Sequence, residues 1–405
     1  MNFVSKARLL TRILGPLLFC GLLVGNAAGQ GTRPSGSVRD ALQPYVDKHV
    51  LAGAVVLWAD RDRVLGLEAV GYSDVARLVP MKPDALFWIA SMSKPMTATA
   101  LMMLVDEGKV NLTDSVEKYL PEFHDQWLAV EQDAGHQLLK PPSRPITVED
   151  ILSHMSGLPF MSRIEHKIDA YPLREAALSY GLTPLKTEPG SKYDYSNAGI
   201  NTAGRIIEVV SGLPYEEFMR RRLLQPLGMK DTTFWPTESQ LKRLAKSYKP
   251  NATKDGLEEI SIEQLTYPLT SRTRGPSPAG GYFSTAKDLS LFCRMILNGG
   301  VYRGRRYVSE AGIKVMTSVH TRELLGPNGN GYGLGWSVSG RPQHGTALES
   351  TGAFGHGGAY STDLHIDMQR QLITIYLVQH AGYPDNAGGR ILPAFRKAAE
   401  ESIQR

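Results

Sequence analysis

Cysteine is scarce in this chain, and several familiar catalytic signatures are missing. Only two of its 405 residues are cysteine, too few for a disulfide framework. No His-Glu-x-x-His helix and no Cys-x-x-Cys pair occurs, so the sequence predicts neither a metal ion nor another cofactor. No serine has glycine at both the −2 and +2 positions, which excludes the nucleophile elbow of the α/β-hydrolases.

A long apolar run is lacking as well. The apolar core near the N-terminus covers only residues 13–24, whereas a membrane-spanning helix needs about 20 apolar residues. Three basic residues precede this core and small residues follow at 27–29, which is typical of a signal peptide over residues 1–29. We therefore expect an exported protein, periplasmic or secreted, without a stable span in its mature form. A lipid anchor on Cys20 and an uncleaved anchor are the alternatives, although Phe19 is bulky where a lipidated cysteine needs a small neighbour.

The chain has no strong excess of one charge. Its formal net charge is +5, and removal of the signal segment with its three basic residues lowers this to +2. Without a basic run or a basic patch with interleaved aromatics, nothing indicates a nucleic-acid partner. Only Cys293 then remains, so we expect no intramolecular disulfide and a buried thiol. No repeat or low-complexity linker divides the rest, which predicts a single domain over residues 30–405.

The most informative motif present is Ser91-Met92-Ser93-Lys94. An apolar run precedes it and apolar residues at helical spacing follow it, which predicts a buried helix that begins near Ser91. Pro95 is tolerated only in the first turn of such a helix. Residues three apart share a helix face, so the Lys94 amine can reach the Ser91 hydroxyl, and burial makes a lysine a better base. Unpaired N–H groups at the helix N-terminus suit an oxyanion.

Three other segments also fit the Ser-x-x-Lys pattern, at Ser115, Ser239 and Ser284. Two of them lie in polar or charged stretches, and the third precedes a polar helix start. None follows an apolar, strand-like run. A single match is therefore weak evidence, and the assignment to Ser91 depends on partners elsewhere in the chain.

A second candidate element is Tyr195-Ser196-Asn197. The segment 189–197 is rich in Gly, Pro, Ser and Asn and precedes an apolar helix pattern over 200–210. We therefore predict a loop that projects a phenol and an amide toward a cleft. A plain turn with one packed tyrosine is the alternative interpretation.

The third candidate element is His356-Gly357-Gly358, followed by Ala359 and a strand-like stretch over 360–366. Glycines at such a place allow a substrate backbone to lie close to a strand. A simple turn is the alternative. Lys254-Asp255-Gly256 fits a loose Lys/His-x-Gly template too, but its surroundings are polar and not strand-like.

The order of these three elements resembles that of the serine β-lactamase and penicillin-binding protein superfamily. The similarity is to its class C β-lactamase-like branch, which includes DD-peptidases, D-aminopeptidases and related carboxylesterases. Segments 147–158, 280–285 and 332–336 also resemble connecting segments of that family, so the similarity covers about 37–405. It implies an α+β, β-lactamase/transpeptidase-like fold, in which an antiparallel sheet flanked by N- and C-terminal helices adjoins a mostly helical lobe across the active-site cleft.

The hydrophobic pattern is consistent with this architecture. The sheet lobe is expected over about 37–95 and 285–405, and the helical lobe over about 96–284. Individual elements predicted from the pattern are a helix at 37–50, a hairpin at 53–70, a second hairpin at 360–366 and 372–379, and a final helix at 389–404. The polar stretches 123–146 and 250–278 are either substrate-facing loops or plain surface insertions.

The resemblance also implies roles for the motif residues. Ser91 would be the nucleophile, Lys94 and Tyr195 would share its proton, and Asn197 would position Lys94 and the substrate. Tyr195 could also help water attack the acyl-enzyme if a nearby positive charge lowered its pKa. The oxyanion and substrate would lie against the backbone of Ser91 and the strand segment of His356, Gly357, Gly358 and Ala359.

Histidine at position 356 departs from the β-lactamase pattern, which has lysine there. This histidine resembles the DD-peptidase and D-aminopeptidase side of the family, and a neutral imidazole anchors a carboxylate less well than a lysine. We therefore predict a serine hydrolase that forms an acyl-enzyme and cleaves a small ester, amide or D-amino-acid peptide. The alternatives are a class C-like β-lactamase and a penicillin-binding sensor without turnover. A small acyl substrate is the only partner that the sequence indicates, and the oligomeric state stays open.

Overall fold

The computed structural model describes residues 37–133, 135–321, 330–340 and 350–403. The predicted signal peptide at 1–29 lies outside these residues. Within them, no helix has both the length and the apolar character needed to cross a bilayer. The predicted N-terminal helix is present as α1 (Val38–Asp47), which Ser37 caps by accepting the backbone N–H of Asp40 at 3.1 Å.

An antiparallel sheet joins the two ends of the described chain. Among the described residues it has eight strands in the order β12-β13-β14-β15-β16-β1-β2-β3. Its strands are β1 (Gly53–Ala59), β2 (Val64–Asp74), β3 (Val79–Pro80), β12 (Gly331–Tyr332), β13 (Ser337–Val338), β14 (Phe354–Gly357), β15 (Asp363–Asp367) and β16 (Leu372–Leu377). Val55 of β1 lies opposite Leu377 of β16, so an early strand and a late strand meet at the centre. Both predicted hairpins are confirmed, although β15 begins at Asp363 because residues 358–362 form a turn.

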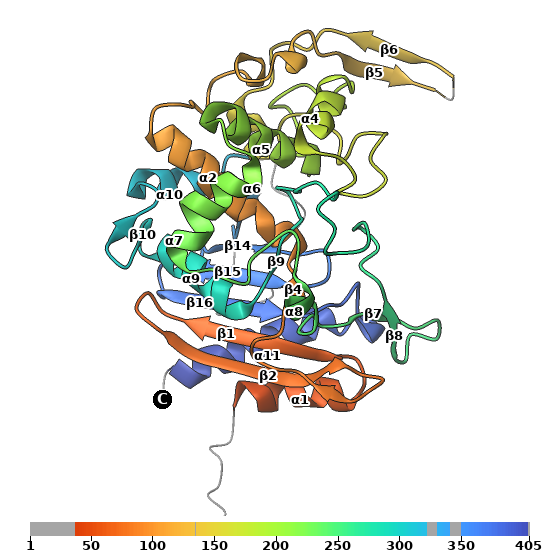
Figure 1. Ribbon diagram of the computed structural model, residues 1–405, viewed down its shortest axis with the longest axis vertical. Helices are drawn as coiled ribbons and strands as arrows, with labels where there is room; N and C mark the ends of the chain where they lie inside the picture. The colour runs from red at the N-terminus through yellow and green to blue at the C-terminus, as the bar shows by residue number, and fades with distance from the viewer. Residues whose placement is uncertain (1–36, 134, 322–329, 341–349, 404–405) are drawn as a thin grey trace, which may run out of the picture. The chain divides into compact units, whose positions relative to one another are not determined.

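The two faces of the sheet carry different helices. Side chains alternate along β1, so Val56 and Trp58 pack with α1 and α11 (Gly388–Ile403), whereas Val55 and Leu57 join the larger core on the other face. Figure 1 shows α1 and α11 below the sheet, with α2 (Lys94–Asp106) and α9 (Ala286–Leu297) above it. Cys293 of α9 is fully buried in that larger core, as the sequence predicts.

In the described middle of the chain, helices cover more residues than strands do, and α5 (Asn197–Ser211) is in contact with α2, α3 and α4. The remaining α-helices are α3 (Val148–Leu152), α4 (Leu173–Gly181), α6 (Tyr215–Met219), α7 (Gln225–Leu227), α8 (Glu238–Leu241) and α10 (Glu310–Met316). A π-helical turn joins α6 to α7, at Arg220–Leu224. Short 3-10 turns occur at Ala90–Ser93, Val116–Lys118, Pro121–Phe123 and Pro384–Asn386.

Both polar stretches contain strands that the sequence pattern did not predict. The first includes the hairpin β5 (Leu128–Gln132) and β6 (Gln137–Lys140), whose turn is closed by Asp133 accepting two backbone N–H groups. The second overlaps the hairpin β7 (Ser247–Pro250) and β8 (Leu257–Ile260). Lys254-Asp255-Gly256 lies at the turn of this second hairpin. Another short hairpin is β10 (Val301–Tyr302) with β11 (Arg305–Arg306).

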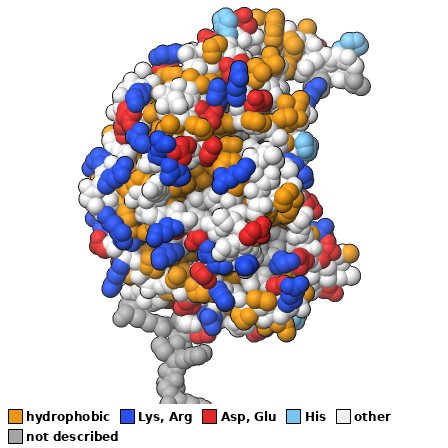
Figure 2. All heavy atoms as spheres, in the orientation of Figure 1, with side chains coloured by type: hydrophobic (Ala, Val, Ile, Leu, Met, Phe, Trp, Pro, Cys, Tyr) orange, Lys and Arg blue, Asp and Glu red, His pale blue; other side chains and the backbone are white. Residues whose placement is uncertain are grey.

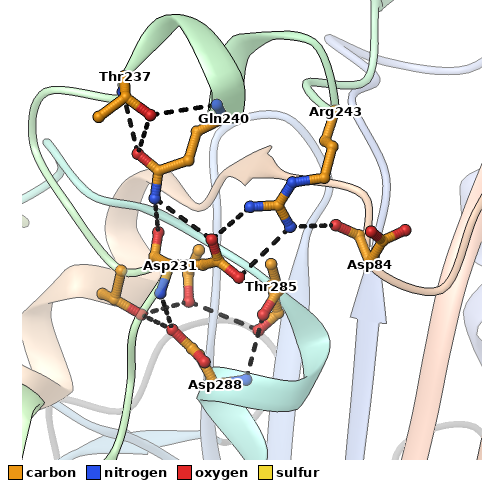
Figure 3. A network of polar contacts seen from close by, with 9 residues as sticks. Asp84, Asp231, Thr237, Gln240, Arg243, Thr285 and Asp288 are labelled. Carbon is orange, nitrogen blue, oxygen red and sulfur yellow. Dashed lines mark hydrogen bonds and ion pairs between the residues drawn. The ribbon is translucent and has the colours of Figure 1, made fainter.

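A polar network ties the start of α9 to the segment that leads into the nucleophile motif (Figure 3). Asp288 of α9 accepts the N–H of Asp231 at 2.7 Å and the hydroxyl of Thr232 at 2.9 Å. Arg243 forms an ion pair with Asp231 and donates to the backbone oxygen of Asp84 at 2.8 Å. The network therefore holds the chain just before β4 (Phe87–Trp88), which pairs with β9 (Phe283–Ser284).

A buried ion pair fixes the long segment after β8. Arg274 donates to Asp169 over 2.7 Å, and both side chains are almost inaccessible, at 2% and 0% exposure. Thr266 donates two further hydrogen bonds to the same carboxylate. This segment is therefore anchored in the interior and is more than a surface insertion.

We expect Asp169→Ala to lower the free energy of unfolding by about 3–5 kcal/mol, because it leaves the Arg274 charge buried without a partner. Urea denaturation measures this change. Glu258→Ala, which breaks an exposed ion pair with Lys249, is the matched control and should change stability little, because solvent screens the pair. Equal losses in the two variants would contradict the anchoring role.

Candidate active site

Ser91 lies in a tight turn between β4 and α2. Ala90 has a left-handed backbone with φ of 46°, a conformation that costs a residue with a Cβ roughly 1–2 kcal/mol and is held here by buried neighbours. Trp88 donates its indole N–H to the oxygen of Gly280 at 2.7 Å, and Ser93 donates to the oxygen of Ala90 at 2.7 Å. Ser91 is partly exposed whereas the residues on either side of it are buried. Ser91 is therefore the residue of this buried segment that a substrate can reach.

Lys94 is fully buried beside Ser91. Its Nζ lies 2.9 Å from Ser91 Oγ, 2.9 Å from Asn197 Oδ1 and 2.8 Å from the backbone oxygen of Ala279. Burial lowers the pKa of Lys94 well below its usual value of 10.5, and the described residues place no carboxylate in hydrogen-bond contact with it. All three contacts are with oxygen atoms, so Lys94 Nζ donates toward Ser91, Asn197 and Ala279. The lowered pKa makes this amine lose a proton more readily than an exposed lysine does.

The Tyr195 ring packs against the Lys94 amine. Its ring centroid is 4.6 Å from Lys94 Nζ, and the His154 ring packs against it with centroids 4.4 Å apart. Burial raises the pKa of Tyr195, and a hydrogen bond with Ser91 opposes this shift only in part. The condition set by the sequence hypothesis, a lowered Tyr195 pKa for water activation, is therefore not met, because burial disfavours the phenolate. Tyr195 is a neutral phenol in this site.

Asn197 is the first residue of α5. The sequence predicts a loop at this position, and for Asn197 that prediction is wrong. Ser196 caps the helix by accepting the N–H of Gly199 at 3.0 Å, and Asn197 donates its own N–H to the oxygen of Phe160 at 3.0 Å. These contacts aim the Asn197 amide at Lys94. The N–H of Ser196 donates to His154 Nδ1 at 3.1 Å, which holds the loop that carries Tyr195.

Sequence reasoning missed two contributors to this site, Ala279 and Asn201. Asn201 accepts the N–H of Ala279 at 3.0 Å, and so anchors the residue whose carbonyl oxygen holds Lys94. Its amide in turn donates to the hydroxyl of Tyr180 at 3.0 Å. Asn201 follows Asn197 by four residues and therefore lies on the same face of α5, which was a usable signal. Nothing in the sequence distinguishes Ala279.

His356 lies on β14 and is buried, with both ring nitrogens engaged. Nδ1 lies 2.7 Å from the oxygen of Gly357, and Nε2 lies 2.9 Å from the hydroxyl of Tyr332. Since Gly357 offers only an acceptor there, Nδ1 carries the proton and Nε2 accepts the Tyr332 O–H. Burial lowers the pKa of His356 to about 3. The imidazole is therefore neutral near pH 7.

The end of β14 lies against the nucleophile turn. A Cβ on Gly358 would approach the oxygen of Ile89 to 2.6 Å, so only glycine allows this contact. In the following turn, the Gly358 N–H donates to the oxygen of Thr362, and the Ser361 N–H donates to the oxygen of Gly358. The Ala359 N–H has no backbone acceptor among the described residues. The structure thus brings the His356–Ala359 segment next to Ser91, and Lys94, Asn197 and Tyr195 meet there as well.

The other Ser-x-x-Lys matches lack this setting. Ser284 is buried and hydrogen-bonded to Thr232 over 2.8 Å. Ser239 is exposed on α8. Ser115 directly precedes the 3-10 turn Val116–Lys118, and its backbone forms an isolated β-bridge with Thr147.

Fold and site together define the class: a β-lactamase/transpeptidase fold with a serine and a buried lysine at the start of its α2 helix. The chain belongs to the Beta-lactamase family, whose model matches residues 38–395. The protein is therefore assigned to the serine hydrolases of this fold.

Several known proteins are similar to this chain in sequence or in structure. Protein Rv1367c of Mycobacterium tuberculosis (strain ATCC 25618 / H37Rv) is 33% identical over 364 residues, which cover 84% of this chain and 88% of that protein. A putative D-alanyl-D-alanine carboxypeptidase of Salmonella agona (strain SL483) is 28% identical over 73% of this chain and 69% of its own. Among solved structures, EstCE1, a hydrolase with promiscuous acyltransferase activity, has a TM-score of 0.75 and 25% identity, and the match covers 89% of this chain and 97% of that one.

Proposed function

We propose that the protein is a serine hydrolase that forms an acyl-enzyme on Ser91 and cleaves small, uncharged esters or amides. The observation that carries this proposal is the 2.9 Å contact between Ser91 Oγ and a buried lysine whose pKa is lowered. A neutral Lys94 accepts the Ser91 proton as the hydroxyl attacks a carbonyl carbon. The N–H groups of Ser91 and Ala359 stabilise the oxyanion that forms.

The second half of the cycle follows from the same groups. As the tetrahedral intermediate collapses, the bond to the leaving group breaks, and the proton held by Lys94 passes to that group through the neutral Tyr195 phenol. Water then attacks the acyl carbon and gives its proton to Lys94. As the bond to Ser91 Oγ breaks, Lys94 returns this proton to the serine oxygen, which restores the hydroxyl and the neutral amine and releases the acid. Asn197 keeps the Lys94 amine in place throughout.

The surroundings of His356 favour substrates without a carboxylate. A neutral imidazole whose two nitrogens are already bonded to Gly357 and Tyr332 offers neither charge nor a free donor to an anionic group. β-Lactams and D-Ala-D-Ala peptides both carry a carboxylate. β-Lactam hydrolysis is the second hypothesis. The similarity to a putative D-alanyl-D-alanine carboxypeptidase supports DD-peptidase activity as a further candidate. Export through a signal peptide at 1–29 is part of the proposal.

The test is a substrate comparison with the purified protein, using a nitrophenyl ester, nitrocefin and a D-Ala-D-Ala peptide. We expect kcat/KM to be highest for the ester, with continuing turnover in pre-steady-state traces. A single stoichiometric burst would instead identify a sensor, and faster hydrolysis of nitrocefin would favour the β-lactamase.

His356→Lys should shift specificity toward carboxylate-bearing substrates. A lysine there supplies a positive charge, so the ratio of kcat/KM for nitrocefin to that for the nitrophenyl ester should rise about tenfold, as one charge-assisted hydrogen bond allows. Tyr332→Phe is the control, because it removes the hydroxyl partner of His356 without adding charge. An unchanged ratio in His356→Lys would show that residue 356 does not set this preference.

A further inference from the structure

A hollow lies outside the Ser91 site, at the turn between β1 and β2. Its volume is about 690 Å³, and its described walls come from that turn, from α9 and from the β10–β11 hairpin. The arginines among the described lining residues are Arg61, Arg63, Arg294 and Arg303, and Asp62 is the carboxylate among them. Two stretches that are distant in the sequence, 61–64 and 294–303, thus supply one basic surface, so no single basic run in the sequence predicts it.

The walls of this hollow are held together by hydrogen bonds. Asn298 of α9 donates to the oxygen of Arg61 at 2.8 Å and accepts from the Arg61 guanidinium at 3.1 Å. The guanidinium carbons of Arg294 and Arg303 each lie 5.4 Å from the centre of the Tyr302 ring. Arg61, Arg294 and Arg303 are therefore each held by a contact with a neighbouring side chain.

Within the described parts of the chain, no carboxylate lies at ion-pair distance from these positive charges. Arg61, Arg63, Arg294 and Arg303 form no ion pair with any described residue, and the same holds for Arg305 and Arg306 on the same hairpin. By contrast, Arg220, Arg222 and Arg243 each pair with a carboxylate. Figure 2 shows Lys and Arg side chains gathered along the left edge of the view, where Figure 1 places β10 and the β1–β2 turn.

We propose that this hollow and its rim bind the phosphate groups of an anionic lipid surface. Guanidinium groups match phosphate geometry and stay charged at every physiological pH. Most of these arginines are exposed and lie on separate segments, so they suit several phosphates in a plane better than one small anion. Val64, 38% exposed beside them, offers an apolar contact at headgroup level.

Vesicle co-sedimentation of the purified full chain tests this proposal. Vesicles of phosphatidylglycerol and phosphatidylcholine should bind the protein at low salt and release it at high salt, whereas pure phosphatidylcholine reports any contribution of the apolar residues 13–24. Each arginine near such a surface contributes about fivefold in affinity, so the triple variant R61Q/R63Q/R303Q should bind the anionic vesicles roughly 100-fold more weakly.

The matched control is R77Q/R174Q/R390Q, which removes the same charge from exposed arginines elsewhere and should weaken binding less than about threefold. Both triple variants should hydrolyse the nitrophenyl ester like the parent chain, which shows that they are folded. Equal weakening in both would overturn the proposed site, as would failure of the parent chain to prefer phosphatidylglycerol. Binding of inorganic phosphate in calorimetry without vesicle binding would overturn the lipid assignment.

Discussion

Replacing Ser91 with alanine should reduce ester hydrolysis by about 10⁴-fold or more, because removal of a nucleophile abolishes the acyl-enzyme route and leaves only binding and the oxyanion site. The hydroxyl makes few contacts that support the fold, so the free energy of unfolding should change little. Initial rates with a nitrophenyl ester measure the effect on activity. Mass spectrometry of the intact chain should show acylation of the parent protein and none of the variant.

The control for this experiment is provided by the chain itself. Ser239→Ala removes the serine of another Ser-x-x-Lys match, one that is exposed on α8, and it should leave both rate and acylation unchanged. If Ser91→Ala retained hydrolysis and labelling while Ser239→Ala lost them, the nucleophile would have to be reassigned. Loss of rate with persistent acylation at another residue would equally contradict the role of Ser91.

The core of the site was predictable because part of its geometry is local. Ser91 and Lys94 are one helical turn apart, so their contact follows from helix geometry once the apolar flanks place α2 correctly. The strand pairs β1–β2 and β15–β16 were predictable for a similar reason, since each is a hairpin with a short polar turn. The approach of Tyr195 and Asn197 to Lys94 came from family resemblance and not from any local rule.

Other features depend on contacts that no sequence pattern encodes. Ala279 holds Lys94 through a backbone oxygen, which any residue carries, and Asn201 of α5 holds Ala279 in place. The two unpredicted hairpins form in polar stretches with little periodicity, where turn hydrogen bonds such as those of Asp133 decide the structure. The neutral state of His356 likewise follows from burial and from Tyr332, which is 24 residues away in the chain.

Lys94→Met should lower kcat by about 10²–10⁴-fold, the usual contribution of a general base, while preserving the packing of the buried side-chain stem. For the parent chain, activity requires a neutral Lys94, so kcat should rise with pH as Lys94 loses its proton. Because burial lowers the pKa of Lys94, this rise should occur well below pH 10.5. The small residual activity of Lys94→Met should lack the rise.

The same substitution should have the opposite effect on stability. Between the lowered pKa of Lys94 in the folded state and the usual value of 10.5, the unfolded chain binds one more proton than the folded chain, so the stability of the parent protein rises with pH across that window. Lys94→Met removes this cost and should be more stable than the parent at pH 7, with a difference that shrinks as the pH approaches 10.5. Urea denaturation at several pH values measures it, and Ser91→Ala, which keeps Lys94, should retain the slope of the parent. A Lys94→Met variant that is less stable at pH 7 and follows the parent slope would mean that Lys94 is charged in the folded protein, and the base would then have to be sought elsewhere.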